Sequence, residues 1–124
     1  MKTMVIDDSR AVRRLLCSYM KGLGIETVEA TDGCEALSRM GMVEASEIDL
    51  ALVDWNMPNM SGIEFVKELR SCPEYDHLKI MMVTSHNEPE DLMTAIEYGA
   101  NEFLMKPFDE EMVQDKLRIL GILN

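Results

Sequence analysis

The sequence predicts an α/β fold in which five strands alternate with five helices along one domain of 124 residues. Two observations carry this prediction: short apolar runs recur along the chain, and most segments between them repeat apolar residues at helical spacing. The apolar runs lack polar alternation, which is typical of strands buried on both faces. Parallel strands need crossover connections, so we expect a doubly wound parallel sheet with helices on both faces.

The first predicted strand, residues 3–6, ends in Asp7 and Asp8, and Ser9 is placed to cap the helix that follows. Gly24 provides the C-terminal stop of that helix. The apolar stripe of the helix consists of Val12, Leu15, Leu16, Tyr19, Met20 and Leu23.

A shorter, more exposed strand is predicted at residues 25–30, and residues 31–33 form a turn. The second helix is expected from about residue 34 to 42, and the acidic segment 44–49 connects it to the next strand.

The third strand is the run Leu50-Ala51-Leu52-Val53, which stops at Asp54, and Pro58 prevents the strand from continuing. Residues 56–62 are rich in loop-forming residue types. The third helix follows and ends before Cys72, with an inward stripe of Ile63, Phe65, Val66 and Leu69.

The fourth strand, residues 80–83, ends in Thr84, and Pro89 is well placed in the first turn of the fourth helix, which Gly99 ends. The inward stripe predicted for this helix is Leu92, Met93, Ala95 and Ile96.

The fifth strand, residues 103–105, ends in Lys106 and Pro107. Asp109 then caps the last helix, and two glutamates in its first turn favour the positive end of the helix dipole. The buried stripe of this helix is Val113, Leu117 and Leu120.

Composition excludes several functions. Twelve Lys and Arg against 23 Asp and Glu give a net charge of −11, which disfavours nucleic-acid binding. The basic cluster Arg10, Arg13 and Arg14 is interpreted as a solvated helix face.

The chain has three cysteines and no CxxC pair, which favours a reducing cytoplasm over disulfides or a zinc site. Polar residues interrupt every candidate membrane span. The 12 methionines are interpreted mainly as core residues.

The polar residues that end four strands are the candidate site. If the strands are parallel neighbours, Asp7, Asp8, Asp54, Thr84 and Lys106 meet at one edge of the sheet. Such crowded carboxylates repel one another unless a cation intervenes, and oxygen ligands favour Mg²⁺ or Mn²⁺. A hydroxyl and an ammonium group beside them fit an anion such as a phosphoryl group.

The nucleophile for phosphoryl chemistry would be Asp54, because it stands alone at the end of the central strand, and it would form an aspartyl phosphate. The alternative is structural: Asp7 and Asp8 would be capping residues, with Lys106 as their salt-bridge partner. Four such coincidences in one short chain favour the functional interpretation.

These residues carry a resemblance. Asp7-Asp8, the stretch from Asp54 to Gly62, Thr84-Ser85 and Lys106-Pro107-Phe108 resemble bacterial two-component response-regulator receiver domains, and most closely the single-domain chemotaxis regulators of the CheY type. The resemblance spans essentially the whole chain. It implies a flavodoxin-like sheet of order 2-1-3-4-5, a cis bond between Lys106 and Pro107, and one receiver domain over residues 1–124 with no output domain.

The resemblance also implies roles. Asp54 would accept a phosphoryl group from a sensor histidine kinase or a histidine phosphotransfer protein. Asp8 and Asp54 would bind Mg²⁺ directly, Asp7 largely through water and Asn56 through its backbone carbonyl, while Thr84 and Lys106 would contact the phosphoryl oxygens. Such a protein is a switch, with Mg²⁺-dependent self-phosphorylation and autodephosphorylation as its only chemistry.

The resemblance also implies roles for Phe103, Asn56 and His86, and for a surface that would bind a target protein. Phe103 stands where the CheY type carries a tyrosine, so it is either the switch aromatic or a plain core residue. Asn56 and His86 would flank the access route of the phosphoryl group and tune its lifetime, although His86 also fits an exposed loop histidine. The fourth helix, fifth strand and fifth helix, including Met93, Ile96, Tyr98 and Phe103, would form the face for a target protein.

Three alternatives compete with this interpretation. Haloacid-dehalogenase-like phosphatases share the aspartyl nucleophile but require a second carboxylate two residues later, where this chain has Asn56. A receiver-like binding module that works without phosphorylation would typically have lost an acidic or lysine position, and none is lost here. A DNA-binding regulator is disfavoured because no output domain follows the last helix.

Overall fold

Five parallel strands form one sheet in the order β2-β1-β3-β4-β5, as predicted. The computed structural model describes residues 1–42 and 47–124. The strands are β1 (Lys2–Ile6), β2 (Glu26–Ala30), β3 (Leu50–Asp54), β4 (Lys79–Thr84) and β5 (Glu102–Met105). All five residues of β3 are buried, which explains why this central strand is an unbroken apolar run up to its final aspartate.

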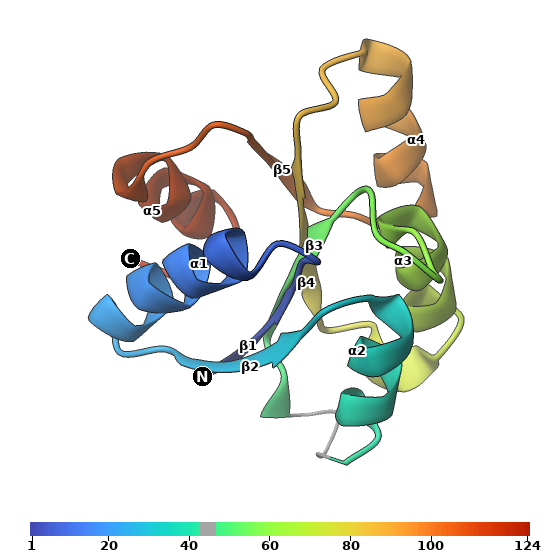
Figure 1. Cartoon of the computed structure of the whole chain (residues 1–124), viewed down its shortest axis with the longest axis horizontal. Helices are drawn as coiled ribbons and strands as arrows, with labels where there is room; N and C mark the ends of the chain where they lie inside the picture. The colour runs from blue at the N-terminus through green and yellow to red at the C-terminus, as the bar shows by residue number, and fades with distance from the viewer. Residues whose placement is uncertain (43–46) are drawn as a thin grey trace.

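Helices cover both faces of the sheet (Figure 1). They are α1 (Arg10–Gly22), α2 (Gly33–Met40), α3 (Gly62–Arg70), α4 (Pro89–Tyr98) and α5 (Glu110–Ile119). One hydrophobic core lies under α1 and α5 and includes Leu16, Met20 and Leu117, whereas the other lies under α2, α3 and α4 and includes Phe65. This division into two cores is what a doubly wound sheet requires.

Side-chain caps fix where the helices begin. Ser9 and Asp109 accept backbone N–H bonds at the starts of α1 and α5, as predicted. Ser61 forms a complete capping box with Glu64 at the start of α3. Gly99 ends α4 in the left-handed conformation, with φ of 116°. The positions at which polar loops give way to helices are therefore set by local hydrogen bonds.

Several sequence predictions are wrong in detail. Leu15, Met93 and Ile96 were assigned to inward stripes, but they are 41%, 63% and 47% exposed. Each lies at the edge of an amphipathic stripe, where spacing does not separate a core position from a surface one. The second helix ends at Met40 rather than residue 42. The interpretation of the methionines as mainly core residues is confirmed, although Met1, Met42, Met93 and Met112 are exposed.

The acidic connector predicted at residues 44–49 lies partly outside the described residues, since residues 43–46 are not described. The sequence did not predict the short 3₁₀ helix η2 (Pro73–Tyr75) between α3 and β4. Within the described parts of the chain, no helix combines the length and apolarity needed to cross a bilayer.

Candidate functional site

The strand register brings the predicted site residues to one edge of the sheet. Ile6 pairs with Val53, Asp54 with Val83, and Thr84 with Met105. The residues that follow or end these strands therefore emerge side by side at the carboxyl edge. This edge is where open α/β sheets place their ligands.

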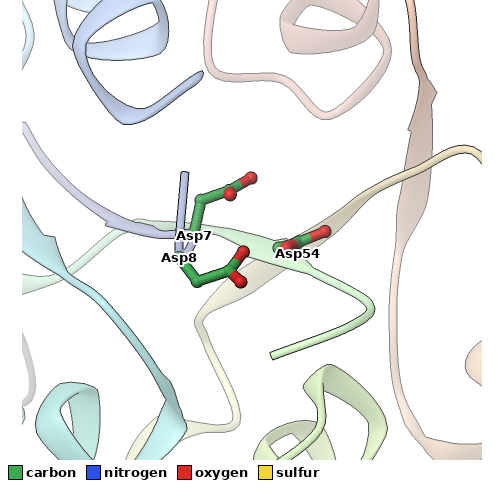
Figure 2. A group of neighbouring side chains, drawn as sticks. All are labelled: Asp7, Asp8 and Asp54. Atoms are coloured by element: carbon green, nitrogen blue, oxygen red, sulfur yellow. The ribbon is translucent and has the colours of Figure 1, made fainter. Parts of the chain in front are cut away.

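Three carboxylates gather there. Asp7 and Asp8 follow β1, Asp54 ends β3, and one carboxylate oxygen of each lies within 4.8 Å of the others (Figure 2). Asp7 is 1% and Asp54 6% exposed, whereas Asp8 is exposed to solvent. The cluster thus has two buried carboxylates and one at its mouth.

Lys106 is the cation nearest to this cluster in the described structure. Its Nζ donates to Asp54 Oδ1 at 3.2 Å and to Asp7 Oδ2 at 3.4 Å. Partial burial lowers the pKa of Lys106, but the neighbouring Asp7 and Asp54 carboxylates outweigh this effect and leave the pKa raised. The ammonium group is therefore held charged between the two buried carboxylates. The bond that follows it, Lys106–Pro107, is cis, as expected.

One ammonium group does not neutralise the cluster. Burial raises the pKa of Asp54 to about 6, the Asp7 carboxylate adds to the rise, and Lys106 offsets part of it. Three oxygen donors without nitrogen or sulfur ligands are the set preferred by hard divalent cations. The residues present therefore fit a divalent metal site.

Backbone contacts orient Asp7. Its Oδ1 accepts from the backbone N–H of Ser9 at 2.8 Å, and its carbonyl accepts from Arg13 Nη1 at 2.7 Å. The side chain of Arg13 is 13% exposed and also pairs with Glu29 at 3.3 Å. The interpretation of the arginine cluster as a solvated helix face is thus wrong for Arg13, which anchors the segment carrying the acidic pair.

Asn56 and His86 lie two residues beyond the strand-end residues Asp54 and Thr84. Asn56 Nδ2 and His86 Nε2 are 3.1 Å apart, a direct contact that the sequence did not predict. The backbone N–H of His86 donates to Thr84 Oγ1 at 2.9 Å. The His86 side chain is 31% exposed.

Two further contacts of His86 were not anticipated from the sequence. Trp55 stacks on the imidazole, with ring centroids 4.8 Å apart and an interplanar angle of 17°. Asp91, in the first turn of α4, lies 3.1 Å from His86 Nδ1. Side-chain stacking depends on the conformation of the loops, which residue spacing does not specify. The only sequence signal for a role of Trp55 was its position next to Asp54.

Phe103 on β5 is half-buried and packs against the core under α4. It also lines a shallow apolar groove of about 250 Å³ together with Leu92, Met93, Ile96 and Glu97. Both the core and the switch interpretations of Phe103 are compatible with this position. Tyr98, at the end of α4, is 39% exposed.

Comparison with known proteins gives concordant matches. The family described as the response regulator receiver domain matches residues 3–118. The chain is 36% identical over 123 residues to a chemotaxis protein CheY homolog of Campylobacter jejuni, covering 98% of this chain and 93% of that protein. It is 35% identical over 118 residues to chemotaxis protein CheY-3 of Vibrio cholerae, covering 94% and 88% of the two chains.

A solved structure supports the same likeness. The chemotaxis response regulator CheY4 of Vibrio cholerae superposes with a TM-score of 0.89 at 33% identity, over 96% of this chain and 97% of that chain. The similarity therefore covers nearly the whole length of both chains.

Proposed function

The chain belongs to the response regulator receiver domain family, and from this premise we propose that Asp54 accepts a phosphoryl group from the phosphohistidine of a sensor kinase or a histidine phosphotransfer protein. Receiver domains of this type are response regulators rather than enzymes. The observation that carries the proposal is the position of Asp54. It is a buried carboxylate at the end of the central strand, 3.2 Å from Lys106 and beside two further carboxylates.

The transfer is a displacement at phosphorus. A carboxylate oxygen of Asp54 forms a bond to the phosphorus atom as the bond from phosphorus to the donor histidine nitrogen breaks, and the electron pair of that bond remains on nitrogen. Negative charge on the phosphoryl oxygens must be neutralised as this happens. Lys106 would supply one positive charge, and the Thr84 hydroxyl, whose oxygen accepts from the His86 backbone N–H, would donate its own hydrogen to a phosphoryl oxygen.

The metal is proposed to be Mg²⁺, with Mn²⁺ able to replace it. Asp8, Asp54 and the backbone carbonyl of Asn56 would hold it directly, and Asp7 through water. The bonds that Asp7 already makes to Ser9 and Lys106 favour this indirect role. When bound, the divalent metal ion supplies further positive charge, in addition to that of Lys106, against the phosphoryl oxygens. It also removes the mutual repulsion of the carboxylates.

The output is proposed to be a change in affinity for a target protein at the α4–β5–α5 face. Met93 and Ile96 are exposed there, beside the groove that Phe103 lines. Phosphorylation would draw Thr84 towards the phosphoryl group and reorient Phe103, which shifts the population towards the binding-competent state. Since Phe103 lacks a hydroxyl, the target contact would be apolar at this position.

Chemotaxis-type signalling is the proposed setting, because the relatives described above are named as chemotaxis proteins. Phosphorylation-independent binding is the second candidate. It shares the apolar face with the first candidate and differs only in what happens at Asp54.

Intact-protein mass after incubation with acetyl phosphate separates the two candidates. We expect one added phosphoryl group on the wild type in the presence of Mg²⁺ and none after chelation. Asp54→Asn should abolish the adduct, whereas the exposed Asp115→Asn should retain it. A folded wild type that takes up no phosphoryl group under any condition would favour the phosphorylation-independent binding module.

A further inference from the structure

A chain of side-chain contacts links the two loops that flank Asp54. Asn56 meets His86 at 3.1 Å, His86 meets Asp91 at 3.1 Å, and Trp55 stacks on the His86 ring at 4.8 Å between centroids. We call these four residues the His86 bridge. Trp55 and Asn56 belong to the loop after β3, His86 to the loop after β4, and Asp91 to α4.

Three contacts fix the orientation of the His86 ring. A carboxylate only accepts hydrogen bonds, so Nδ1 of His86 donates to Asp91. Nε2 is then the acceptor for the amide of Asn56. The Trp55 ring covers one face of the imidazole at an interplanar angle of 17°. The ring therefore has one orientation in which all three contacts are made.

The bridge also reaches the strand ends. The backbone N–H of His86 donates to Thr84 Oγ1 at 2.9 Å, and Asp54 pairs with Val83, the residue before Thr84. Asn56 and His86 thus lie in the loops that follow two neighbouring strands, β3 and β4, and they meet at the carboxyl edge of the sheet. The contact between them therefore joins the loop after β3 to the loop after β4.

We propose that Trp55 and Asp91 are positioning residues that hold the His86 imidazole against Asn56 as a cover over the in-line approach to Asp54. This inference rests on the proposed phosphoacceptor function. In an in-line displacement, the donor that delivers a phosphoryl group and the water that later removes it occupy the same position opposite the Asp54 oxygen. A cover over that position slows both reactions.

The cover has a kinetic signature that distinguishes it from other roles. Loosening the ring raises the rate of phosphorylation by a small donor and the rate of hydrolysis by similar factors. A histidine that instead oriented the attacking water would, once loosened, lower hydrolysis and leave phosphorylation unchanged. A purely structural contact would change the stability and neither rate.

The experiment measures both rates by intact-protein mass, with acetyl phosphate as donor and after its removal, at fixed Mg²⁺. Trp55→Leu and Asp91→Ala should each raise both rates by about threefold to tenfold, which corresponds to the loss of one stacking or hydrogen-bonding contact. Trp55→Phe and Asp91→Asn keep a planar ring and a hydrogen-bond acceptor, and should restore both rates to within about twofold of wild type. Glu90→Ala, a neighbouring first-turn acid outside the bridge, is the control.

Fluorescence reports the stack independently of the chemistry, because Trp55 is the only tryptophan. His86→Leu and Asp91→Ala should change its emission, and Glu90→Ala should not. Unchanged rates in folded Trp55→Leu and Asp91→Ala variants, or a change in hydrolysis alone, would overturn the positioning role. A wild type that takes up no phosphoryl group would instead overturn the proposed function, and the cover with it.

Discussion

Burial and the Asp7 carboxylate raise the pKa of Asp54 to about 6, above its ordinary value of 3.8. The folded protein therefore binds this proton more tightly than the unfolded chain does. The stability that comes from this group is present below about pH 4 and is lost as the pH rises through about 6. At neutral pH, the metal-free protein thus carries an ionised carboxylate that folding disfavours.

Asp54→Asn should remove this effect. In a chelating buffer, we expect the variant to exceed the wild type in unfolding free energy by about 1 to 3 kcal/mol at pH 7.5, and by less than about 1 kcal/mol at pH 4. Urea unfolding at the two pH values measures the difference. Asp115→Asn, an exposed carboxylate paired with Arg118, should show no comparable change with pH. An advantage of Asp54→Asn that is equal at both pH values would contradict the prediction.

At this same scale, the sequence predicted the strand-end residues but not their neighbours. Asp7, Asp54, Thr84 and Lys106 could be identified because each ends an apolar run, and parallel strands bring such ends together. The contacts of the His86 bridge could not be predicted, because they depend on how two irregular loops fold against each other.

At the scale of helices and strands, all five strands and five helices were predicted, because apolar runs and helical spacing are strong signals. Cap residues such as Ser9 and Asp109 also allowed the first residues of α1 and α5 to be predicted. The exposure of Met93 and Ile96 was not predicted, since which edge of a helix faces solvent depends on how far neighbouring elements extend.

Gly62, at the start of α3, lies directly against the end of β3. Its backbone N–H donates to the Trp55 carbonyl at 2.9 Å, and a Cβ here would collide with the carbonyl oxygen of Asp54. Gly62→Ala should therefore lower the unfolding free energy by more than about 2 kcal/mol and slow phosphorylation, because the strand end must shift.

Gly22→Ala is the matched control for this substitution, because a Cβ at Gly22 meets no atom within 4 Å. Alanine is the better helix former at the end of α1, so Gly22→Ala should be neutral or stabilising by up to about 1 kcal/mol. Thermal or urea unfolding of both variants checks the prediction. Equal stability of the two variants would show that the close approach at Gly62 can relax.

Arg70, at the end of α3, contacts the segments that lead into β4 and β5, at the edge of the sheet where these strands begin. Its guanidinium donates to the carbonyls of Gly99, Tyr75 and Leu78 at 3.0, 2.8 and 2.7 Å, and to Asn101 Oδ1 at 3.0 Å. A lysine cannot reproduce this fork of donors. Arg70→Lys should lower the unfolding free energy by about 1 to 3 kcal/mol. Arg118→Lys, whose exposed side chain pairs only with Asp115 in the described structure, should change it by less than about 0.5 kcal/mol.

At the scale of the whole molecule, three carboxylates gather at one edge of the sheet in a chain whose net charge is −11. Two cores fix the sheet from both sides, so the edge cannot relax by separating its carboxylates. The fold therefore maintains an electrostatic strain at neutral pH that a bound cation would relieve. A divalent cation bound at this edge would therefore stabilise the entire domain.

Mg²⁺ should accordingly stabilise the wild type, because the proposed site exists at the folded edge and not among the dispersed carboxylates of the unfolded chain. A concentration ten times the dissociation constant should add about 1.4 kcal/mol to the unfolding free energy. Asp8→Asn removes a proposed ligand at the mouth of the cluster and should abolish most of this gain, whereas Asp115→Asn should retain it. Since protons compete with the metal at Asp54, the gain should also weaken as the pH falls below about 6. Thermal unfolding across a Mg²⁺ titration at pH 7.5 and pH 5 measures each effect. A gain that survives Asp8→Asn undiminished would place the cation elsewhere on the acidic surface.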